Sequence, residues 1–418
     1  MADAPGAAAQ PHAPSEPSPI AIYATYGVGF AGNGVAMMLK VVVPLWAIQL
    51  QLSPSQIGIV IGIAGLLPTL LAIHGGVLMD RLGTKRVTMA FGLTTALMCP
   101  LYPVFPLFAA VVILQLITGL TSTMVWVGAQ SLIVRFTKGK TSLIARFSVA
   151  ARMGTLLGPV TVGAIWDLAG PWGAFFFAGA AGLLVLIALT KVPETGEAGR
   201  TAGRTAARPA RPKLRDLIPN RRDYARAFAM LAMPAVALVI VMTVLRNSST
   251  GIQTSFYIVY LKEVGFLGTV IGILIGISEG AGMFGALMAG WWEKFFRPHW
   301  VLIGFVVMSL ACVAITPILG GILVLLIIAT TGRGYAQGLT QPVIFGVLSR
   351  AVGQDVQGAS IGLRTTFNRL ASVVVPFGMG FIADWVGLVN SFYVLGAILI
   401  GCCGVVALLV RRIPDFRT

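Results

Sequence analysis

The feature that most restricts the fold of this chain is a series of long apolar runs separated by short polar connections. A helix needs roughly 20 consecutive apolar residues to cross the hydrocarbon layer of a membrane, and the runs reach that length repeatedly. The chain of 418 residues is 57% hydrophobic and only 11% charged, which is more apolar surface than a water-soluble domain could bury. A closed β-barrel would instead show short segments of alternating apolar and polar residues. The sequence therefore predicts an all-α membrane protein.

The apolar runs predict twelve transmembrane helices, arranged as two bundles of six. We expect an N-terminal bundle over residues 19–192 and a C-terminal bundle over residues 227–411. The Ala-, Pro- and Ser-rich residues 1–18 predict a disordered, uncleaved tail, since they lack the apolar core of a signal peptide. The Arg-, Pro- and Ala-rich residues 193–226 predict a flexible cytoplasmic linker, and residues 412–418 a cytoplasmic tail. The expected spans are residues 20–49, 55–79, 86–107, 108–134, 142–168, 172–191, 228–261, 266–291, 299–319, 321–348, 357–384 and 388–410.

The net charge of +16 would suggest a nucleic-acid partner if the basic residues formed a stripe on a soluble domain. They gather instead in alternate connections: one set holds the linker and most of the other Lys and Arg residues, and the other set holds only Lys262. Such an asymmetry is typical of membrane proteins whose basic loops stay in the cytoplasm. We therefore expect no nucleic-acid partner, and a multi-pass protein of the cell (inner) membrane with both termini in the cytoplasm.

The sequence contains no arrangement of residues that points to enzymatic chemistry. Its four cysteines lie in apolar stretches without metal-ligand spacing. We find no nucleophile with an accompanying base, no cluster of metal ligands and no phosphate-binding loop. The chain is therefore predicted not to be an enzyme, and neither a cofactor nor a metal is expected.

The two halves of the sequence repeat one another. In the fifth and eleventh spans, an offset of 217 residues relates Arg152, Pro159, Gly163, Asp167 and Gly170 to Arg369, Pro376, Gly380, Asp384 and Gly387. A slightly different offset relates Asn33, Gly58 and Gly62 to Asn247, Gly272 and Gly276. Duplicated six-span halves are a recurring plan of secondary transporters, whose substrate site lies near mid-membrane where the halves meet. The repeat therefore predicts a transporter with its site between the bundles.

The connection after the second span reads Gly76-Val-Leu-Met-Asp80-Arg81-Leu-Gly83-Thr-Lys85-Arg86. It resembles the loop signature of the major facilitator superfamily, Gly-x-x-x-Asp-Arg-x-Gly-x-basic-basic, at the place where that family carries it. The resemblance implies two pseudo-symmetric six-helix bundles, transport by alternating access, and a gating role for this loop as a latch. Apart from the family, Gly83 permits a tight turn, and Asp80 with its basic neighbours can pair with helix ends. The alternative is that the basic residues serve only as a topology signal.

A second motif lies in the fifth span, which reads Gly154-Thr-Leu-Leu-Gly158-Pro159. It resembles the Gly-x-x-x-Gly-Pro motif of antiporters in the same superfamily, and the resemblance implies gating by this segment and exchange of a drug or organic solute for protons. Small residues also let helices approach closely, so ordinary helix packing explains the motif equally well. Two residues depart from the family pattern. Val162 replaces one glycine at the end of the motif, and Gln115 stands where the fourth span often has an arginine.

Ionisable residues inside the spans are unevenly distributed. Spans three, six, nine and twelve contain none, whereas six other spans hold seven cations and a single deep carboxylate, Glu279. An ionised group facing lipid costs on the order of ~3 kcal/mol, so these groups should face a hydrated or protein-lined interior. The four uncharged spans are therefore expected at the periphery, and the cavity between the others should favour an anion. The seven cations are Lys40, Arg146, Arg152, Arg246, Arg333, Arg364 and Arg369.

The candidate substrate-binding residues come from these cations and from polar residues of the repeat. Arginine grips a carboxylate or phosphate with two hydrogen bonds, and the repeat-related Arg152 and Arg369 lie deepest in their spans. They could instead bond carbonyls exposed near the prolines. Glu279 is the candidate for proton coupling, or alternatively a partner in a structural ion pair. Further substrate-binding candidates are Arg246, Lys40, Arg333, Asn33, Asn247 and Tyr257. The asparagines could equally hold helices together.

These features predict secondary active transport of a small anionic or amphipathic solute by alternating access, as proton-coupled efflux. Two alternatives keep the same fold: proton-coupled uptake of an organic anion, and transport of a lipid or lysolipid whose headgroup binds the basic site. A transporter-like sensor would need an output domain, which the linker is too short to supply. The expected partners are the small-molecule substrate, protons and membrane lipid, and the expected working unit is a monomer.

Overall fold

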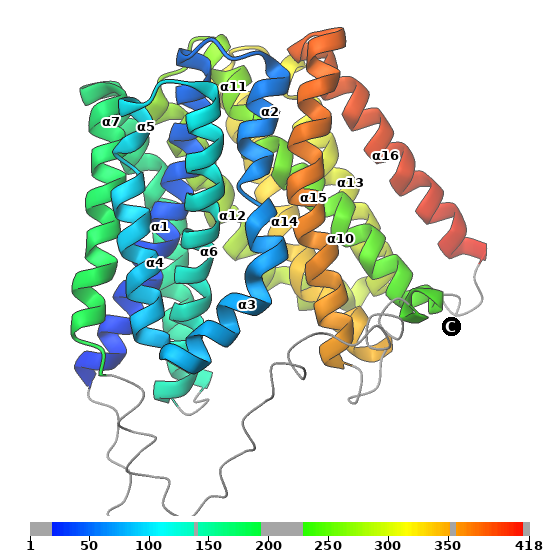
Figure 1. Cartoon of the computed structure of the whole chain (residues 1–418). Coiled ribbons are helices and arrows are strands. Elements are labelled where there is room, and N and C mark those ends of the chain that lie inside the picture. Colours follow the sequence, from blue (N-terminus) through cyan, green and yellow to red (C-terminus); the bar gives the residue numbers. More distant parts are fainter. Residues whose placement is uncertain (1–18, 138–140, 194–228, 352–356, 413–418) are drawn as a thin grey trace, which may run out of the picture.

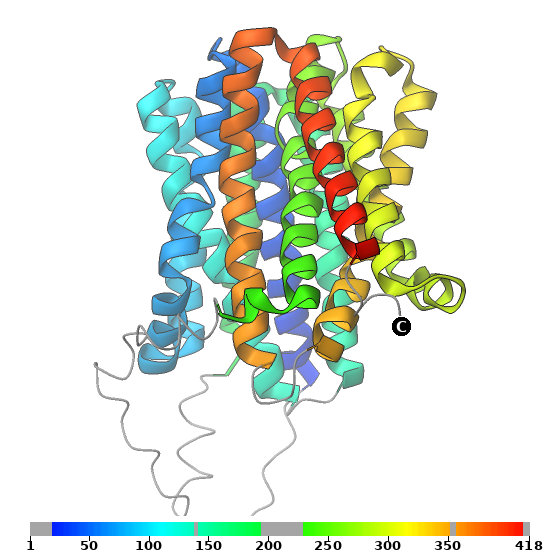
Figure 2. The same cartoon turned by 90° about the vertical axis from the view of Figure 1, so that its right-hand side faces the viewer.

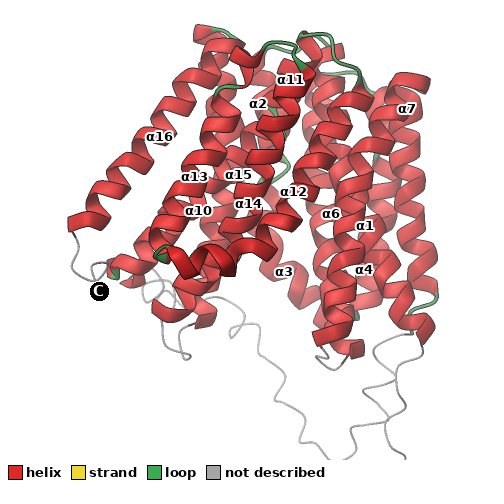
Figure 3. Ribbon diagram, turned by 180° about the vertical axis from the view of Figure 1, so that it is seen from behind, coloured by secondary structure: helices red, strands yellow, loops and turns green. Residues whose placement is uncertain are grey.

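A computed structural model of the chain describes residues 19–137, 141–193, 229–351 and 357–412. The expected tails and nearly all of the expected linker lie outside these residues, so the structure does not bear on them. The described residues form helices joined by short turns, with no strand among them (Figure 3). This is the arrangement that a hydrocarbon environment requires, because a helix satisfies its backbone hydrogen bonds within one segment.

The first half of the chain supplies six spans from seven helices, because two of its spans are broken and one helix contains two spans. The break in the second span falls after Ile63 and the break in the third span after Met98. The fifth and sixth spans run as one helix that turns sharply at Gly170, where φ is 66°. The helices are α1 (Pro19–Gln49), α2 (Pro54–Ile63), α3 (Leu66–Leu82), α4 (Thr84–Met98), α5 (Leu101–Val104), α6 (Phe108–Thr137) and α7 (Thr141–Thr190).

The second half also supplies six spans, but its helices break at other places. Its first span is broken at Thr254 and Ser255, between α10 and α11, and its third span ends in a short 3-10 turn. The elements are η2 (Met230–Ala232), α10 (Pro234–Gln253), α11 (Phe256–Glu263), α12 (Gly268–Phe295), α13 (Pro298–Ala314), η3 (Thr316–Leu319), α14 (Leu323–Ala351), α15 (Gln357–Val386) and α16 (Leu388–Arg412).

Nine helical segments of the described chain are long and apolar enough to cross a membrane on length and composition alone. One of them, Ser142–Thr190, contains two spans separated by the turn at Gly170. The shorter apolar helix α13 and the helix α14 complete the set of twelve; α14 is less apolar because Arg333, Gln337 and Gln341 interrupt it. The predicted all-α fold of twelve helices in two bundles is therefore confirmed.

The two bundles stand side by side (Figures 1 and 2). Helices α1 to α7 form one bundle and α10 to α16 the other, and they meet where α2 packs against α15 and α7 packs against α12. These two contacts correspond to one another under the internal repeat. We call the side where α7 ends and α10 begins the linker face, and the side where α7 turns at Gly170 the distal face.

The bundles touch most closely in the distal halves of their helices, through glycines. A Cβ atom on Gly58 of α2 would lie 2.4 Å from the carbonyl oxygen of Pro376 on α15. A Cβ atom on Gly272 of α12 would lie 2.2 Å from the carbonyl oxygen of Pro159 on α7. Real Cβ atoms do not approach so closely, so both contacts require glycine, as in other tightly packed membrane helices. The distal face is therefore closed by direct contact between backbones.

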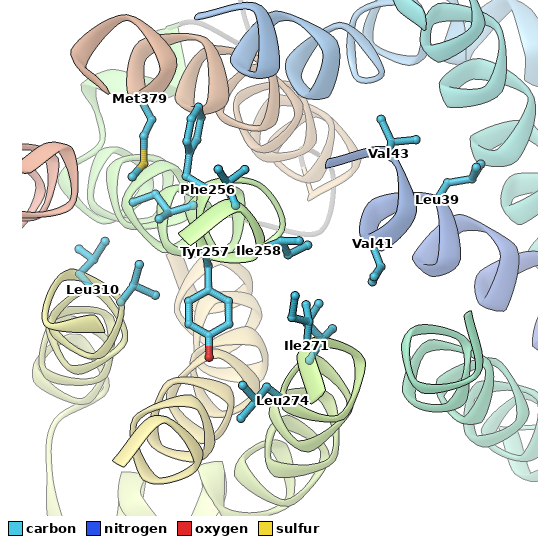
Figure 4. Packing of buried hydrophobic residues seen from close by; sticks show 14 of the residues in the cluster. Leu39, Val41, Val43, Phe256, Tyr257, Ile258, Ile271, Leu274, Leu310 and Met379 are labelled. Carbon is cyan, nitrogen blue, oxygen red and sulfur yellow. The ribbon is translucent and has the colours of Figure 1, made fainter. Parts of the chain in front are cut away.

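Apolar side chains fill the space between these two contacts. The largest cluster of buried apolar residues crosses from one bundle to the other and includes Val41 and Val43 of α1, Ile258 of α11 and Ile271 of α12 (Figure 4). All four are completely buried. Such close packing excludes water, so the cluster seals the molecule between the cavity described below and the distal face.

Gly272 provides a test of the distal closure. We expect Gly272→Val to separate the bundles at the distal face, because the added side chain cannot fit against Pro159. Spin labels at Gln51 and Leu267, in a Cys402→Ser background that lacks the exposed native cysteine, should move further apart in this variant. The measurement is the distance distribution from double electron–electron resonance.

Gly290→Val is the matched control, since it lies on the same helix and a Cβ atom there meets nothing within 4 Å. Its distance distribution should equal that of the parent. Equal distributions for the variants at Gly272 and Gly290 would contradict the proposed contact.

Candidate functional site

A cavity of about 350 Å³ lies between the bundles. It is lined by parts of α1, α2, α3, α6, α10 and α15, and by the breaks after α2 and α10. None of the lining residues belongs to α4, α5, α13, α16 or the second half of α7, which contain the third, sixth, ninth and twelfth spans. The expectation that these four spans are peripheral is therefore confirmed for this cavity, which we call the central cavity.

Two cations line the central cavity, Lys40 from α1 and Arg369 from α15. Lys40 is solvent-exposed although it lies in the middle of a spanning helix, and Arg369 is half-buried. None of the described residues that line the cavity is acidic. A charged side chain at this depth is costly in lipid, so both cations are expected to face a hydrated interior rather than the bilayer.

Polar side chains from the first bundle complete the wall. Asn33, Gln115 and Trp126 line the cavity. Gln115 accepts a hydrogen bond of 2.8 Å from the hydroxyl of Tyr102. That bond occupies the oxygen of the Gln115 side-chain amide, and the NH₂ group of the same amide is a hydrogen-bond donor. Apolar side chains such as Leu39 lie among these polar groups. The cavity thus combines two cations with hydrogen-bonding and apolar surface.

The structure places Arg246 and Asn247 in contacts between helices, outside the lining of the central cavity. The guanidinium of Arg246 donates to the carbonyl oxygen of Gln337 at 2.9 Å and to the hydroxyl of Thr340 at 3.0 Å. The amide of Asn247 donates to both the backbone and the side-chain oxygen of Asn368. These bonds hold α10 against α14 and α15. Asn247 thus differs from Asn33, its counterpart in the repeat, which lines the cavity.

Arg333 and Tyr257 lie deeper within the second bundle. Arg333 is only 4% exposed, and its Nη2 atom donates to the hydroxyl of Ser278 on α12 at 2.5 Å. The hydroxyl of Tyr257 shares a hydrogen bond of 2.7 Å with Thr330. Both residues line a second, much smaller cavity inside this bundle. Sequence reasoning grouped them with the substrate-binding cations, whereas the structure separates them from the central cavity.

Glu279 and Arg152 are not among the described residues that line the central cavity. Glu279 is half-buried on α12 and interacts electrostatically with Lys40, Arg246 and Arg333. Arg152 is exposed on α7 and interacts electrostatically with Arg246. One carboxylate therefore serves several cations, and the repeat-related Arg152 and Arg369 do not meet in one cavity. The roles predicted for Arg152 and Glu279 stay predictions.

The loop that resembles the family signature is described only in part. Gly76 and the side chains of Asp80 and Arg81 lie outside the described part of the structure. Gly83 has φ of 96° and joins α3 to α4, so the expected tight turn is confirmed. Lys85 is half-buried and Arg86 exposed at the start of α4, on the linker face. Their gating role stays a prediction.

The second motif packs helices together. A Cβ atom on Gly154 would lie 2.1 Å from the carbonyl oxygen of Phe30, and one on Gly158 would lie 2.7 Å from that of Gly34. Both glycines therefore let α7 lie against α1 within the first bundle. The carbonyl of Pro159 faces Gly272 of the other bundle. The motif thus supports both the internal packing and the distal contact, and a gating role for it stays a prediction.

The distal face carries a pair of carboxylates that the sequence analysis left without a function. Asp167, at the distal turn of α7, accepts hydrogen bonds from the backbone N–H groups of Gly268 at 2.8 Å and Thr269 at 2.7 Å. It also accepts a bond of 2.6 Å from the Thr269 hydroxyl. Gly268 and Thr269 are the first residues of α12, so a carboxylate of one bundle caps a helix of the other.

Asp384 occupies the corresponding place on α15. Its two oxygens each lie 3.3 Å from the backbone nitrogen of Ser55, in the first turn of α2. That helix start also has a local cap, since the Ser53 hydroxyl accepts a hydrogen bond of 3.3 Å from the backbone N–H of Gln56. The offset of 217 residues that relates Asp167 to Asp384 was the signal that could have revealed this pair.

Two matching six-helix bundles around a hydrated polar cavity define the class of secondary membrane transporters. The family model described as Major Facilitator Superfamily matches residues 25–261 and 239–417, nearly the whole chain. This chain belongs to the major facilitator superfamily and is a multi-pass membrane transporter. The resemblance drawn from the loop after the second span is thereby confirmed.

Known proteins resemble this chain in sequence and in structure. The sequence match is a resistance protein, and the structural matches are transporters. Quinolone resistance protein NorA of Staphylococcus aureus (strain MRSA252) is 25% identical over 394 residues, which cover 91% of this chain and 93% of NorA. The crystal structure of nucleoside transporter NupG has a TM-score of 0.73 at 13% identity and covers 93% of this chain and 97% of its own. The crystal structure of a bacterial homologue of the human lysosomal transporter Spinster, in an inward-facing and unoccupied conformation, has a TM-score of 0.73 at 15% identity. It covers 94% of this chain and 97% of its own. At such identities the structures establish the fold alone.

The two cross-bundle caps give a second prediction. Removing the carboxylate by Asp167→Ala should open the distal face more often, by about fivefold, since a helix cap is worth roughly 1 kcal/mol. A cysteine placed at Thr123, in the central cavity, should then react faster with a membrane-impermeant thiol reagent added on the distal side.

Asp384→Ala should also raise the rate at which the cysteine at position 123 reacts, but by less, because the hydrogen bonds of Asp384 are longer. Asp167→Asn keeps one acceptor oxygen, so its reaction rate should lie between those of the parent and Asp167→Ala. Unchanged reaction rates in both alanine variants would show that the caps do not hold the distal face closed.

Proposed function

We propose that this transporter carries a small organic anion, or an amphipathic molecule with an anionic group, through the central cavity. The observation that carries the proposal is the composition of the wall: Lys40 and Arg369 supply two cations, and no lining residue is acidic. A site with uncompensated positive charge raises the local concentration of anions. Its volume of about 350 Å³ is of the size that holds a small organic molecule.

In this proposal, Arg369 and Lys40 bind the anionic group from opposite bundles. Arg369 can form two parallel hydrogen bonds with a carboxylate or phosphate, whereas Lys40 acts as a compact charge. Asn33 and Gln115 offer hydrogen bonds from the first bundle, and Trp126 offers an aromatic surface. Because the two cations belong to different bundles, an anion between them would draw the bundles together. Substrate binding would thereby favour closure, as alternating access requires.

We propose proton-coupled efflux as the direction of transport, with the linker face and both termini in the cytoplasm. Similarity to a protein named for quinolone resistance supports efflux. The orientation is supported by the basic residues, because Lys85, Arg86, Arg135 and Lys294 lie near helix ends on the linker face, whereas Lys262 lies near the distal face. In the closed-distal structure described above, the central cavity would then load from the cytoplasm.

Uptake of an organic anion together with protons is a second candidate, favoured by the position of Glu279. Its carboxylate interacts with Lys40, so protonation would remove a negative charge that competes for that cation. Proton and anion would then bind best together, which is the coupling that uptake down a proton gradient needs. Proteoliposomes with an imposed pH gradient decide the direction. Uptake together with protons makes the anion move in the same direction as the protons, whereas efflux in exchange for protons makes it move in the opposite direction. Headgroup-specific scrambling of labelled lysolipid in the same vesicles would point to lipid transport instead.

The anion site gives a third prediction. We expect Arg369→Met and Lys40→Met each to weaken binding of a carboxylate substrate by at least about tenfold, since hydrogen bonds to charged groups are worth roughly 1.5–3 kcal/mol. The measurement is a binding screen on purified protein with aromatic carboxylates and with matched cationic compounds.

Arg412→Gln, at the end of α16, serves as the control and should bind as the parent does. Stronger binding of cationic compounds than of carboxylates by the parent protein would overturn the proposal. So would carboxylate binding that both methionine variants retain.

A fourth prediction concerns the coupling carboxylate. Glu279→Gln should abolish transport driven by a pH gradient, because the side chain can no longer gain and lose a proton near Lys40. Exchange of labelled for unlabelled substrate should continue, since it needs no net proton movement. Transport by this variant that still follows the pH gradient would refute a coupling role for Glu279.

A further inference from the structure

The second bundle contains a small cavity that the proposed transport cycle does not use. It has a volume of about 10 Å³, room for one species of roughly the size of a water molecule. It lies among α10, α11, α13 and α14. We call it the Arg333 pocket; it is lined by Gln253, Tyr257, Cys312, Val313, Thr316, Ala329, Thr330 and Arg333.

The Arg333 pocket is bordered by polar nitrogen atoms without hydrogen-bond partners. Arg333 and Gln253 are 4% and 3% exposed, so water outside the protein does not solvate them. Nε and Nη1 of Arg333 and Nε2 of Gln253 are buried and have no hydrogen-bond partner among the residues that the structure describes. All three are hydrogen-bond donors. Buried donors are almost always satisfied in folded proteins, so three of them on one small cavity point to a bound group that accepts hydrogen bonds.

The charge of Arg333 indicates what kind of group this is. Its hydrogen bond to Ser278 is with a neutral hydroxyl and leaves the positive charge uncompensated. Glu279 acts on Arg333 electrostatically, but it also acts on Lys40 and Arg246. A buried ion without its own counter-ion is strongly unfavourable. The pocket therefore favours an acceptor that carries a negative charge.

Size and donor chemistry narrow the choice further. A carboxylate or phosphate is too large for about 10 Å³, whereas a monatomic anion approaches the size of a water molecule. A water molecule could donate to the hydroxyl oxygens of Thr316 and Thr330, but it would leave the charge of Arg333 without a counter-ion. We propose that the Arg333 pocket binds one chloride ion, held by Arg333 and Gln253.

This site is distinct from the central cavity. Gln253 lines the Arg333 pocket, whereas the next residue, Thr254, lines the central cavity on the other side of the break between α10 and α11. A chloride ion bound to Gln253 and Arg333 would tie that break to α14. The site would therefore stabilise the second bundle in the state that presents Thr250 and Thr254 to the substrate.

The test compares thermal unfolding in sodium chloride and in sodium gluconate at equal ionic strength. It is made on the purified protein and on Lys40→Met, because gluconate is a carboxylate and this variant removes a cation that would bind it in the central cavity. We expect chloride to raise the unfolding midpoint saturably, by about 3 °C, as a ligand that binds only the folded state does. Bromide should act like chloride and give an anomalous diffraction peak beside Arg333. Equal midpoints in chloride and gluconate for both proteins, or a bromide peak elsewhere with none beside Arg333, would overturn the proposal.

Variants of Gln253 allow the proposal to be tested even if Arg333→Gln fails to fold. Gln253→Leu should weaken the apparent chloride affinity by at least about tenfold, since it removes one of the donors. Gln253→Glu supplies an internal carboxylate for Arg333, so this variant should be as stable in gluconate as in chloride. A full chloride response in Gln253→Leu would contradict the assigned site.

Two controls separate this site from the rest of the protein. Arg412→Gln tests the effect of removing a cation from the surface and should keep the full chloride response. Lys40→Met tests the central cavity and should also keep it. Loss of the response in Lys40→Met but not in Gln253→Leu would place the halide in the central cavity and overturn the proposal. These measurements need no transport, so they stand apart from the test of the proposed function.

Discussion

The closed distal face depends on backbone groups of one bundle that are satisfied by the other. The first N–H groups of α12 have no partner within their own helix, and Asp167 of the opposite bundle accepts from them. Backbone carbonyls at Pro159 and Pro376 meet glycines in the same region. None of these contacts is strong alone. Their amides lie near the membrane surface, so on opening they would find water rather than lipid, and a contact that can be exchanged for water suits a gate that must open repeatedly.

The internal repeat explains the gate better than it explains the substrate site. Asp167 and Asp384 cap helices in corresponding ways, and Gly58 and Gly272 form corresponding contacts. Asn33, in contrast, lines the central cavity, whereas its counterpart bonds to Asn368. A symmetric gate is required of two bundles that rock against each other, but a single substrate between them contacts each bundle differently. Symmetry is therefore retained where the bundles touch and lost where they bind.

Much of the fold could be predicted from the sequence, because lipid imposes simple rules on length and charge. Spans without charge proved to be peripheral, since a charged residue must face a hydrated interior. The breaks in the helices were not predicted. The one after Ile63 had a signal, since Pro68 cannot donate a hydrogen bond to the carbonyl of Ala64, whereas no proline lies close to Thr254. The turn at Gly170 was expected, since a glycine precedes Pro171 there.

The candidate site was harder to predict, because the sequence gives the depth of a residue and not its direction around the helix. Arg246 and Arg369 both lie inside their spans, yet only Arg369 lines the central cavity. Arg246 is engaged by the carbonyl of Gln337, which is 91 residues away in the chain. Such a bond depends on how α10 and α14 pack. Pairing of this kind cannot be read from one helix alone.

The balance of charges connects these separate sites. Glu279 is the one deep carboxylate that acts on Lys40, Arg246 and Arg333, so a change in its protonation alters the field at all three. Arg246 bonds to a carbonyl and a hydroxyl, which satisfy its donors but add no negative charge. The hydrogen bonds of the described residues therefore leave an excess of positive charge in the interior. This excess is the physical basis of the proposed preference for an anionic substrate, because a field of one sign concentrates ions of the other sign.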